Sequence, residues 1–433
     1  MERKLGIIAD DLTGANDSGV GLAEKGISTS VFFDLPRQKE LLHSGIVMDT
    51  NSRALSKGQA FDVTKEAAQF LKDMGYPHIY KKMDSTLRGH IGTELQAVYE
   101  VFQPSFVVVA PAFPELGRTT VDGIHYVNGK ALAETEAARD PKHPVVESFI
   151  PRMIENEIGQ NAGLLRQADF QKDQAAFKMM LDGFLDKGIH FLVCDATTQA
   201  DLKMAAEKIL AITDDVIWAG SAGLAEVLPE ILGIANVKQK EAFHATEQVM
   251  AVCGSLSAIT QKQVNFAKAQ ADVCHVEVDT KEIFSSRWDQ ISKKYVDSCL
   301  DAFAKGKDVI LYVPSDEKIR KEVSLAGKEL GLSSNEIGEY VSSALGKMVA
   351  DTAKQNEKLT GLMLIGGDTA KDTTRCLGGF GFHLIKQVEA GIPLAKLIGT
   401  EKEFIVVTKA GAFGKENSIY QAMQEMKGAD SNE

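Results

Sequence analysis

The stretch VMAVCGS at residues 249–255 is a short apolar run that ends in a glycine and a serine. The pattern recurs in LMLIGGDT at residues 362–369 and in FIVVTKAGAFG at residues 404–414. Short β-rich runs bounded by polar residues are typical of strands buried on both faces of a parallel sheet. A strand that ends in glycine and leads into a helix presents free backbone N–H groups, so an anion can bind there. The three stretches therefore predict an α/β fold with a phosphate-binding edge.

Both halves of the chain carry the same alternation of apolar runs and helical-period segments, which indicates β-α units and parallel sheets. Between residues 233 and 248 the periodicity is lost and the sequence becomes polar. We therefore predict an α/β protein of two lobes, with a domain at residues 1–235 and another at residues 248–433. Each lobe is expected to be a largely parallel sheet flanked by helices, with the active site in the cleft between the lobes.

The expected elements follow from the same pattern. Strands are predicted at residues 5–9, 30–33, 45–48, 78–81, 106–110, 190–194 and 216–219 in the first domain, and at 249–253, 273–278, 308–313, 362–365 and 404–408 in the second. Helices are predicted at residues 17–24, 59–74, 93–102, 201–212 and 333–356, several of them opened by a capping Asp, Ser or Thr.

Composition narrows the class of partners. A chain of 433 residues with 44% hydrophobic content is ample for two or three domains. The net charge of −12 argues against a nucleic-acid surface, which needs a basic face. No apolar stretch approaches the roughly 20 residues that span a bilayer, and the N-terminus lacks a signal-type apolar core. We expect a cytoplasmic protein with small-molecule ligands, without nucleic-acid or membrane partners, and compatible with a homo-oligomer.

The five cysteines lie far apart and show no Cys-x-x-Cys spacing. Zinc sites need closely spaced Cys and His ligands. The sequence therefore predicts structural thiols and no soft-metal site.

Polar residues follow the first predicted strand at the point where open α/β sheets bind ligands. Residues 5–9 run directly into Asp10 and Asp11. Because neighbouring residues of a strand face opposite ways, the two carboxylates are not equivalent. One is expected to cap a helix that begins near Ala15, which leaves the other for chemistry.

Two further strand ends add cations and hydroxyl partners. The strand at residues 45–48 leads to Arg53, and the strand at residues 78–81 leads to Lys82, Met83, Asp84, Ser85 and Arg88. A buried polyhydroxylated acid needs a cation for its carboxylate and polar partners for its hydroxyls. These residues supply that set, although each by itself is also compatible with a surface ion pair or a helix cap.

These stretches together resemble the four-carbon acid sugar kinase family, which phosphorylates threonate, erythronate and oxo-tetronates with ATP. The resemblance covers both lobes and is carried, in the family's order, by residues 9–14, 51–53, 81–89, 110–120, 220–224, 254–257, 366–369 and 409–414. It implies that the N-terminal lobe binds the sugar acid through Asp11, Arg53 and residues 82–85. It also implies that the C-terminal lobe binds ATP through Ser255, Gly366, Gly367, Asp368, Thr369 and Gly411.

Phosphoryl transfer requires alignment of donor and acceptor and neutralisation of charge, with Mg²⁺ bridging phosphate oxygens. We expect Asp368 to be a Mg²⁺ partner through water, because magnesium usually keeps several waters. The carboxylate of the acid would be held by Arg53 or Lys82, and its terminal hydroxyl would be oriented or deprotonated by Asp11 or Asp84.

Within the family, the run NDSGV at residues 16–20 looks more like the D-threonate kinases, with D-erythronate and 3-oxo-tetronate kinases as alternatives. Two functions outside the family are alternatives. A nicotinamide-dependent oxidoreductase is disfavoured because no Gly-x-Gly-x-x-Gly follows the first strand. A sugar-acid sensor without catalysis would keep the same binding residues.

Overall fold

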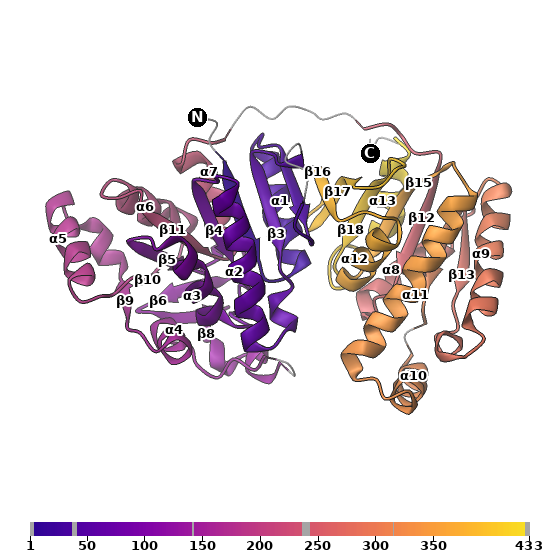
Figure 1. Cartoon of the computed structure of the whole chain (residues 1–433), viewed down its shortest axis with the longest axis horizontal. Coiled ribbons are helices and arrows are strands. Elements are labelled where there is room, and N and C mark those ends of the chain that lie inside the picture. The colour runs from indigo at the N-terminus through magenta and orange to yellow at the C-terminus, as the bar shows by residue number, and fades with distance from the viewer. Residues whose placement is uncertain (1–3, 37–40, 141–142, 236–242, 315, 429–433) are drawn as a thin grey trace. The chain divides into compact units, whose positions relative to one another are not determined.

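The computed structural model describes residues 4–36, 41–140, 143–235, 243–314 and 316–428. The chain divides into two compact units, Met1–Gln239 and Lys240–Glu433. Residues 236–242, which hold this junction and part of the expected boundary, lie outside the described residues. In each unit, helices lie on both faces of a sheet (Figure 1). The expected α/β class is therefore confirmed.

The first unit contains a parallel sheet with the strand order β2-β3-β1-β4-β11-β5-β10-β9. Its strands are β1 (Leu5–Ala9), β2 (Thr29–Phe32), β3 (Gly45–Asp49), β4 (His78–Lys82), β5 (Phe106–Ala110), β9 (Ala162–Leu165), β10 (Phe191–Cys194) and β11 (Val216–Gly220). Its helices are α1 (Leu12–Glu24), α2 (Lys57–Asp73), α3 (Ile91–Phe102), α4 (Ile150–Ile158), α5 (Gln174–Leu185), α6 (Gln199–Leu210) and α7 (Ala222–Ile231). Every residue of β1 and β5 is buried, as expected for strands covered on both faces.

A small antiparallel sheet of the first unit was not predicted from the sequence. It consists of β6 (Arg118–Val121), β7 (Ile124–Val127) and β8 (Lys130–Ala131). The turns between these strands contain Asp122-Gly123 and Asn128-Gly129, all four residues with positive φ. Such dipeptides are the strongest short-range hairpin signal, so the sequence did contain the information.

The second unit has the strand order β13-β14-β12-β15-β18-β17-β16. The strands β12 (Gln248–Cys253), β13 (Val273–Glu277), β14 (Asp308–Tyr312), β15 (Leu359–Ile365) and β18 (Ile405–Lys409) are parallel, whereas β16 (Gly381–Glu389) and β17 (Ile392–Ile398) form an antiparallel hairpin next to β18. The hairpin was not predicted, although its two-residue loop ends in Gly391, which has positive φ. The helices are α8 (Ala258–Lys268), α9 (Trp288–Ala304), α10 (Glu317–Glu329), α11 (Ser334–Gln355), α12 (Gly367–Cys376) and α13 (Ser418–Met426).

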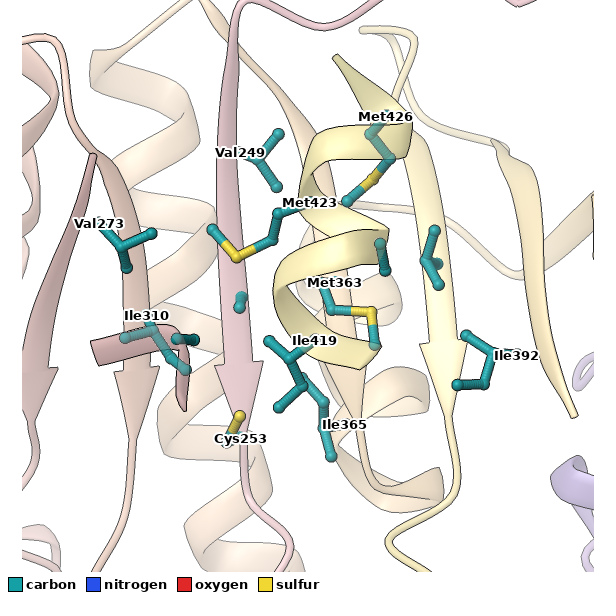
Figure 2. Packing of buried hydrophobic residues seen from close by; sticks show 14 of the residues in the cluster. Val249, Cys253, Val273, Ile310, Met363, Ile365, Ile392, Ile419, Met423 and Met426 are labelled. Atoms are coloured by element: carbon teal, nitrogen blue, oxygen red, sulfur yellow. The ribbon is translucent and has the colours of Figure 1, made fainter. Parts of the chain in front are cut away.

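The core of the second unit lies where α13 packs on β12 and β15 (Figure 2). Ile419, Met423 and Met426 of α13 are fully buried against apolar residues of these strands. Burial of side chains of this size contributes about 1.5–3 kcal/mol each. This packing holds the carboxyl ends of β12, β15 and β18 in a stable frame. None of the described helices is both long and apolar enough to cross a membrane.

Candidate active site

The carboxyl ends of three neighbouring strands form one edge of the first unit's sheet. In the parallel register, Ala9 of β1 pairs with Asp49 of β3 on one side and with Lys82 of β4 on the other. The loops that follow these three strands therefore begin next to one another at the same edge of the sheet. This register brings most of the predicted acid-binding residues together, although the predicted set spans 78 positions of the sequence, from Asp10 to Arg88.

Asp10, Asp11 and Arg53 form an ion-pair cluster at this edge. Arg53 Nε donates to Asp10 Oδ2 at 2.9 Å, and Arg53 Nη2 lies 2.8 Å from the same oxygen. Arg53 Nη1 lies 3.1 Å from Asp11 Oδ2. All three guanidinium nitrogens thus contact a carboxylate. Burial by itself lowers the pKa of Arg53, but the nearby carboxylates outweigh it and hold that pKa above its usual range.

Asp11 is also the N-cap of α1. Its Oδ1 accepts a hydrogen bond of 2.8 Å from the backbone N–H of Gly14, in the geometry that satisfies a free amide at a helix start. The prediction that one of the two aspartates caps this helix is confirmed, but the predicted start near Ala15 is wrong, because the helix begins at Leu12. A helix start is hard to place from sequence when its first residues carry little periodicity.

Lys82 differs from Arg53 in that no carboxylate of the described residues pairs with it. Its ammonium donates to the carbonyl of Met83 at 3.0 Å, and within the described residues it forms no ion pair. It lies against the first turn of α1, since a Cβ added to Gly14 would be 2.7 Å from Lys82 Nζ. Burial raises the pKa of nearby Asp17, an effect that the Lys82 ammonium opposes. Lys82 is therefore a buried cation with capacity to bind an anion.

The two carboxylate oxygens of Asp84 differ in their hydrogen bonding. Its Oδ2 accepts hydrogen bonds from Thr86 Oγ1 and Arg88 Nε, each at 2.6 Å. Burial raises the pKa of Asp84, but Arg88, Arg53 and Thr86 outweigh burial and hold the pKa below its usual range. Among the described residues, no group donates to Asp84 Oδ1. This oxygen is therefore available to accept a hydroxyl proton of a ligand.

Met83 and Ser85, the other predicted contacts in this loop, are positioned through their backbones. The Met83 N–H donates to the carbonyl of Gly220 at 2.9 Å, and its side chain is buried. The Ser85 carbonyl accepts a hydrogen bond of 2.9 Å from His125 Nε2. The second ring nitrogen of His125 therefore accepts from Thr120 Oγ1, at 3.1 Å.

His125 was missed by the sequence analysis, because it belongs to the small antiparallel sheet and lies 40 residues from Ser85. Burial lowers the pKa of His125 to about 4, so the ring is neutral at pH 7. Lys81 was also missed. Its ammonium lies 2.5 Å from Glu94 in a fully buried pair beneath the site.

The second unit brings its three predicted glycine turns into contact. A Cβ on Gly254 would lie 2.2 Å from Thr369 Oγ1, so a side chain at this position would displace the Thr369 hydroxyl. A Cβ on Gly411 would lie 2.3 Å from Ser255 Oγ. The turns after β12, β15 and β18 therefore form one continuous edge, as the sequence pattern predicted.

This edge borders a pocket of about 450 Å³ that lies wholly within the second unit. Gly366, Gly367 and Asp368 line it at the start of α12, and Ser255 lines it after β12. The other lining residues are mostly apolar: Leu256, Val313, Pro314, Ile319, Val323, Ile337 and Val341. A pocket that is lined by the start of a helix and by apolar side chains has the complementary groups for a phosphorylated ligand with a flat base.

Asp368 lies in the first turn of α12 and is exposed. No cluster of three or more His, Cys, Asp or Glu residues suited to a metal ion occurs within the described residues. A single exposed carboxylate fits Mg²⁺, which binds proteins through one or two carboxylates and takes its other ligands from waters and substrate phosphates.

Two protein-family models match the chain. A model described as a sugar-binding N-terminal domain matches residues 5–228, and one described as a nucleotide-binding C-terminal domain matches residues 250–419. A solved crystal structure of a Haemophilus influenzae protein has a TM-score of 0.77 and 26% identity to this chain, and the match covers 98% of this chain and 100% of that protein.

Curated relatives match over nearly the whole length. The chain is 30% identical to a D-threonate kinase of Salmonella typhimurium, with 97% of each covered. It is 28% identical to a 3-oxo-tetronate kinase of Haemophilus influenzae, over 95% of this chain and 97% of the relative. It is also 28% identical to a D-erythronate kinase of Heliobacterium modesticaldum, over 99% of this chain and 98% of the relative.

The relatives that match over nearly the whole chain are kinases of four-carbon acid sugars, and with the two matching domains they place the chain in the kinase class. The chain belongs to the four-carbon acid sugar kinase family. The family resemblance predicted from the sequence motifs is thereby confirmed.

Proposed function

We propose that the protein transfers the γ-phosphoryl group of ATP to the terminal hydroxyl of D-threonate. The main support is the pair of sites: a cation-and-carboxylate cluster at the strand ends of one unit, and an amide-lined pocket at the strand ends of the other. Among the three curated relatives named above, identity is highest to the D-threonate kinase. The transfer itself requires that the two ligands meet.

Lys82 is proposed to bind the carboxylate of the acid. The sequence left Arg53 and Lys82 as alternatives, and the contacts of the two side chains favour Lys82. Arg53 already spans Asp10 and Asp11, whereas the hydrogen bond of Lys82 within the described residues goes to a backbone carbonyl and not to a carboxylate. A buried ammonium without a charged partner gains most from an anionic ligand. Arg53 then serves to hold the two aspartates in place.

Asp84 is proposed to accept the hydrogen bond of the reacting hydroxyl. Its Oδ1 is open, whereas Asp11 uses one oxygen for Gly14 and the other for Arg53. A carboxylate with a lowered pKa is a weak base, but the loose transition state of phosphoryl transfer depends more on orientation and charge neutralisation than on base strength. Asp11 remains the alternative base.

The nucleotide is proposed to bind in the pocket of the second unit, with its base between the apolar walls and its phosphates at Ser255, Gly366, Gly367, Thr369 and Gly411. Asp368 would hold Mg²⁺ through water. The metal would neutralise phosphate charge during transfer.

Release of ADP in a coupled assay tests the proposal. We expect a rate that depends on both Mg²⁺ and a four-carbon acid, and that is highest with D-threonate in a panel that includes D-erythronate, L-threonate and the oxo forms. A maximum with another acid would reassign the substrate within the family. Binding of acid without any ADP release would support the sensor alternative and overturn the proposed function.

A further inference from the structure

The loop after β18 is held from one side by a buried lysine. Lys409 Nζ donates to the carbonyls of Ala410, Gly411 and Phe413 at 2.9, 3.4 and 3.0 Å. Only 3% of Lys409 is exposed, and it forms no ion pair within the described part of the chain. Three carbonyl oxygens thus replace the water that the ammonium loses on burial.

Side chains at the start of α8 hold the same loop. Ser257 Oγ and Thr260 Oγ1 both donate to the carbonyl of Gly411, the second at 2.9 Å. Gln263 Nε2 donates to the carbonyls of Phe413 and Lys415 at 3.0 and 2.7 Å. Together with Lys409, these groups bind the backbone oxygens on one side of the loop.

The orientation of the carbonyls determines the orientation of the amides. In a trans peptide the C=O of one residue and the N–H of the next point in opposite directions, and the described chain contains no cis peptide. The amides of Gly411, Ala412 and Gly414 therefore point away from the side chains that hold the carbonyls. In the described structure these three amides donate to no group. Backbone amides without an acceptor in the described structure are suited to bind an anion.

This set of amides adjoins the nucleotide pocket. The α-carbon of Gly411 lies next to Ser255 Oγ, which a Cβ at Gly411 would approach to 2.3 Å. Ser255 in turn lines the pocket. A phosphate at Ser255 would therefore be within reach of the amides of the loop.

We propose that Lys409 is a positioning residue of the nucleotide site: by binding the carbonyls of residues 410, 411 and 413, it directs the amides of Gly411, Ala412 and Gly414 toward the phosphates of the nucleotide. The inference rests on the proposed function. Burying an unpaired lysine is costly, and an apolar side chain of similar length would avoid that cost. The lysine therefore contributes loop geometry that an apolar side chain cannot supply.

The test is Lys409→Met with Lys402→Met as the matched control. Lys402 precedes β18, and its Nζ donates to the carbonyl of Asn356 at 3.0 Å, so its removal reports the general effect of losing a lysine–carbonyl contact near this strand. We expect Lys409→Met to raise KM for ATP about tenfold or more, as for the loss of a hydrogen-bonded charge. KM for the acid should not change. Lys402→Met should leave both KM values unchanged.

Thr260→Val provides a second variant that keeps the shape of the side chain and loses one contact to the loop, together with the contacts of Thr260 Oγ1 to Ser255 Oγ and Ser257 Oγ. We expect KM for ATP to rise about threefold, with only a small loss of thermal stability. A fall in kcat with an unchanged KM for ATP in both Lys409→Met and Thr260→Val would overturn the inference. Unchanged kinetics in both folded variants would overturn it as well.

Equilibrium binding of ATP without acid separates this inference from the proposed function. Absence of ATP binding to the wild-type protein would refute the proposed function. Equal ATP affinity of the wild-type protein and Lys409→Met would refute only the role of Lys409.

Discussion

The two candidate ligand sites occupy the same place in their sheets but use different chemical groups. In the first unit, charged side chains at the ends of β1, β3 and β4 form the site, and their positions depend on ion pairs such as Arg53 with Asp10. In the second unit, backbone amides at the ends of β12, β15 and β18 form the proposed site. Side chains such as Lys409 fix these loops by donating hydrogen bonds to their carbonyls. Substitutions should therefore act through charge in the first site and through shape in the second.

The largest effect is expected from Asp84→Asn. Loss of a catalytic base typically costs about 10²–10⁴-fold in rate, so kcat should fall within this range. ATP affinity, measured by equilibrium binding, should not change. Asp11→Asn is the comparison, because Asn also caps helices well and should preserve α1. A larger loss in Asp11→Asn would transfer the role of base to Asp11, and full activity in both variants would contradict either assignment.

Lys82→Met should have the next largest effect. If Lys82 binds the carboxylate, its loss should raise KM for the acid about 10–100-fold, which corresponds to one hydrogen bond to a charged group. KM for ATP should stay unchanged. Lys65→Met is a suitable control, because the exposed pair of Lys65 with Glu100 contributes little. An unchanged KM for the acid in Lys82→Met would return the role to Arg53.

Gly411→Ala should have a smaller effect that is confined to the nucleotide. The added Cβ would displace Ser255 Oγ, and Gly411 does not have positive φ, so the effect is one of space and not of backbone strain. We expect KM for ATP to rise about 3–10-fold, as for one displaced hydrogen bond. Gly183→Ala, where a Cβ meets no atom within 4 Å, is the control. A changed KM for the acid in Gly411→Ala would contradict the division between the two sites.

The smallest effect is expected on stability, at Glu226 of α7. Burial, together with Glu115 and Asp17, raises the pKa of Glu226 from 4.5 to about 7. The folded state therefore keeps a proton that the unfolded state loses, so the stabilising contribution is complete below pH 4.5 and is lost as the pH rises through 7. Glu226→Gln should unfold at a higher urea concentration than the wild-type protein at pH 8 and at a similar one at pH 4.5.

The fluorescence of Trp218, buried in β11, reports this unfolding when Trp288 is replaced by Phe in both proteins. An equal difference between the two proteins at both pH values would contradict the raised pKa of Glu226.

Much of the fold followed from local patterns. The apolar runs at β1, β5 and β12 coincide with buried strands because a strand covered on both faces must be apolar throughout. The hairpin of β6 with β7 was missed because its half-exposed residues do not form a continuous apolar run, and only its turn residues indicated it. The hairpin of β16 with β17 was missed although β17 is apolar and buried at every residue except Lys396.

The sequence by itself determined the family, the α/β class and the residues that stand at the carboxyl ends of the strands, because these depend on local motifs and on the period of apolar residues. Only the tertiary structure decided which partner each of those residues has. Arg53 is bound to two aspartates and Lys82 is not, His125 holds the carbonyl of Ser85, and Lys409 holds a loop of backbone carbonyls. Hydrogen bonds and ion pairs join atoms that are near in space, and spacing along the chain does not record which residues the packing of sheet and helices brings within 3 Å.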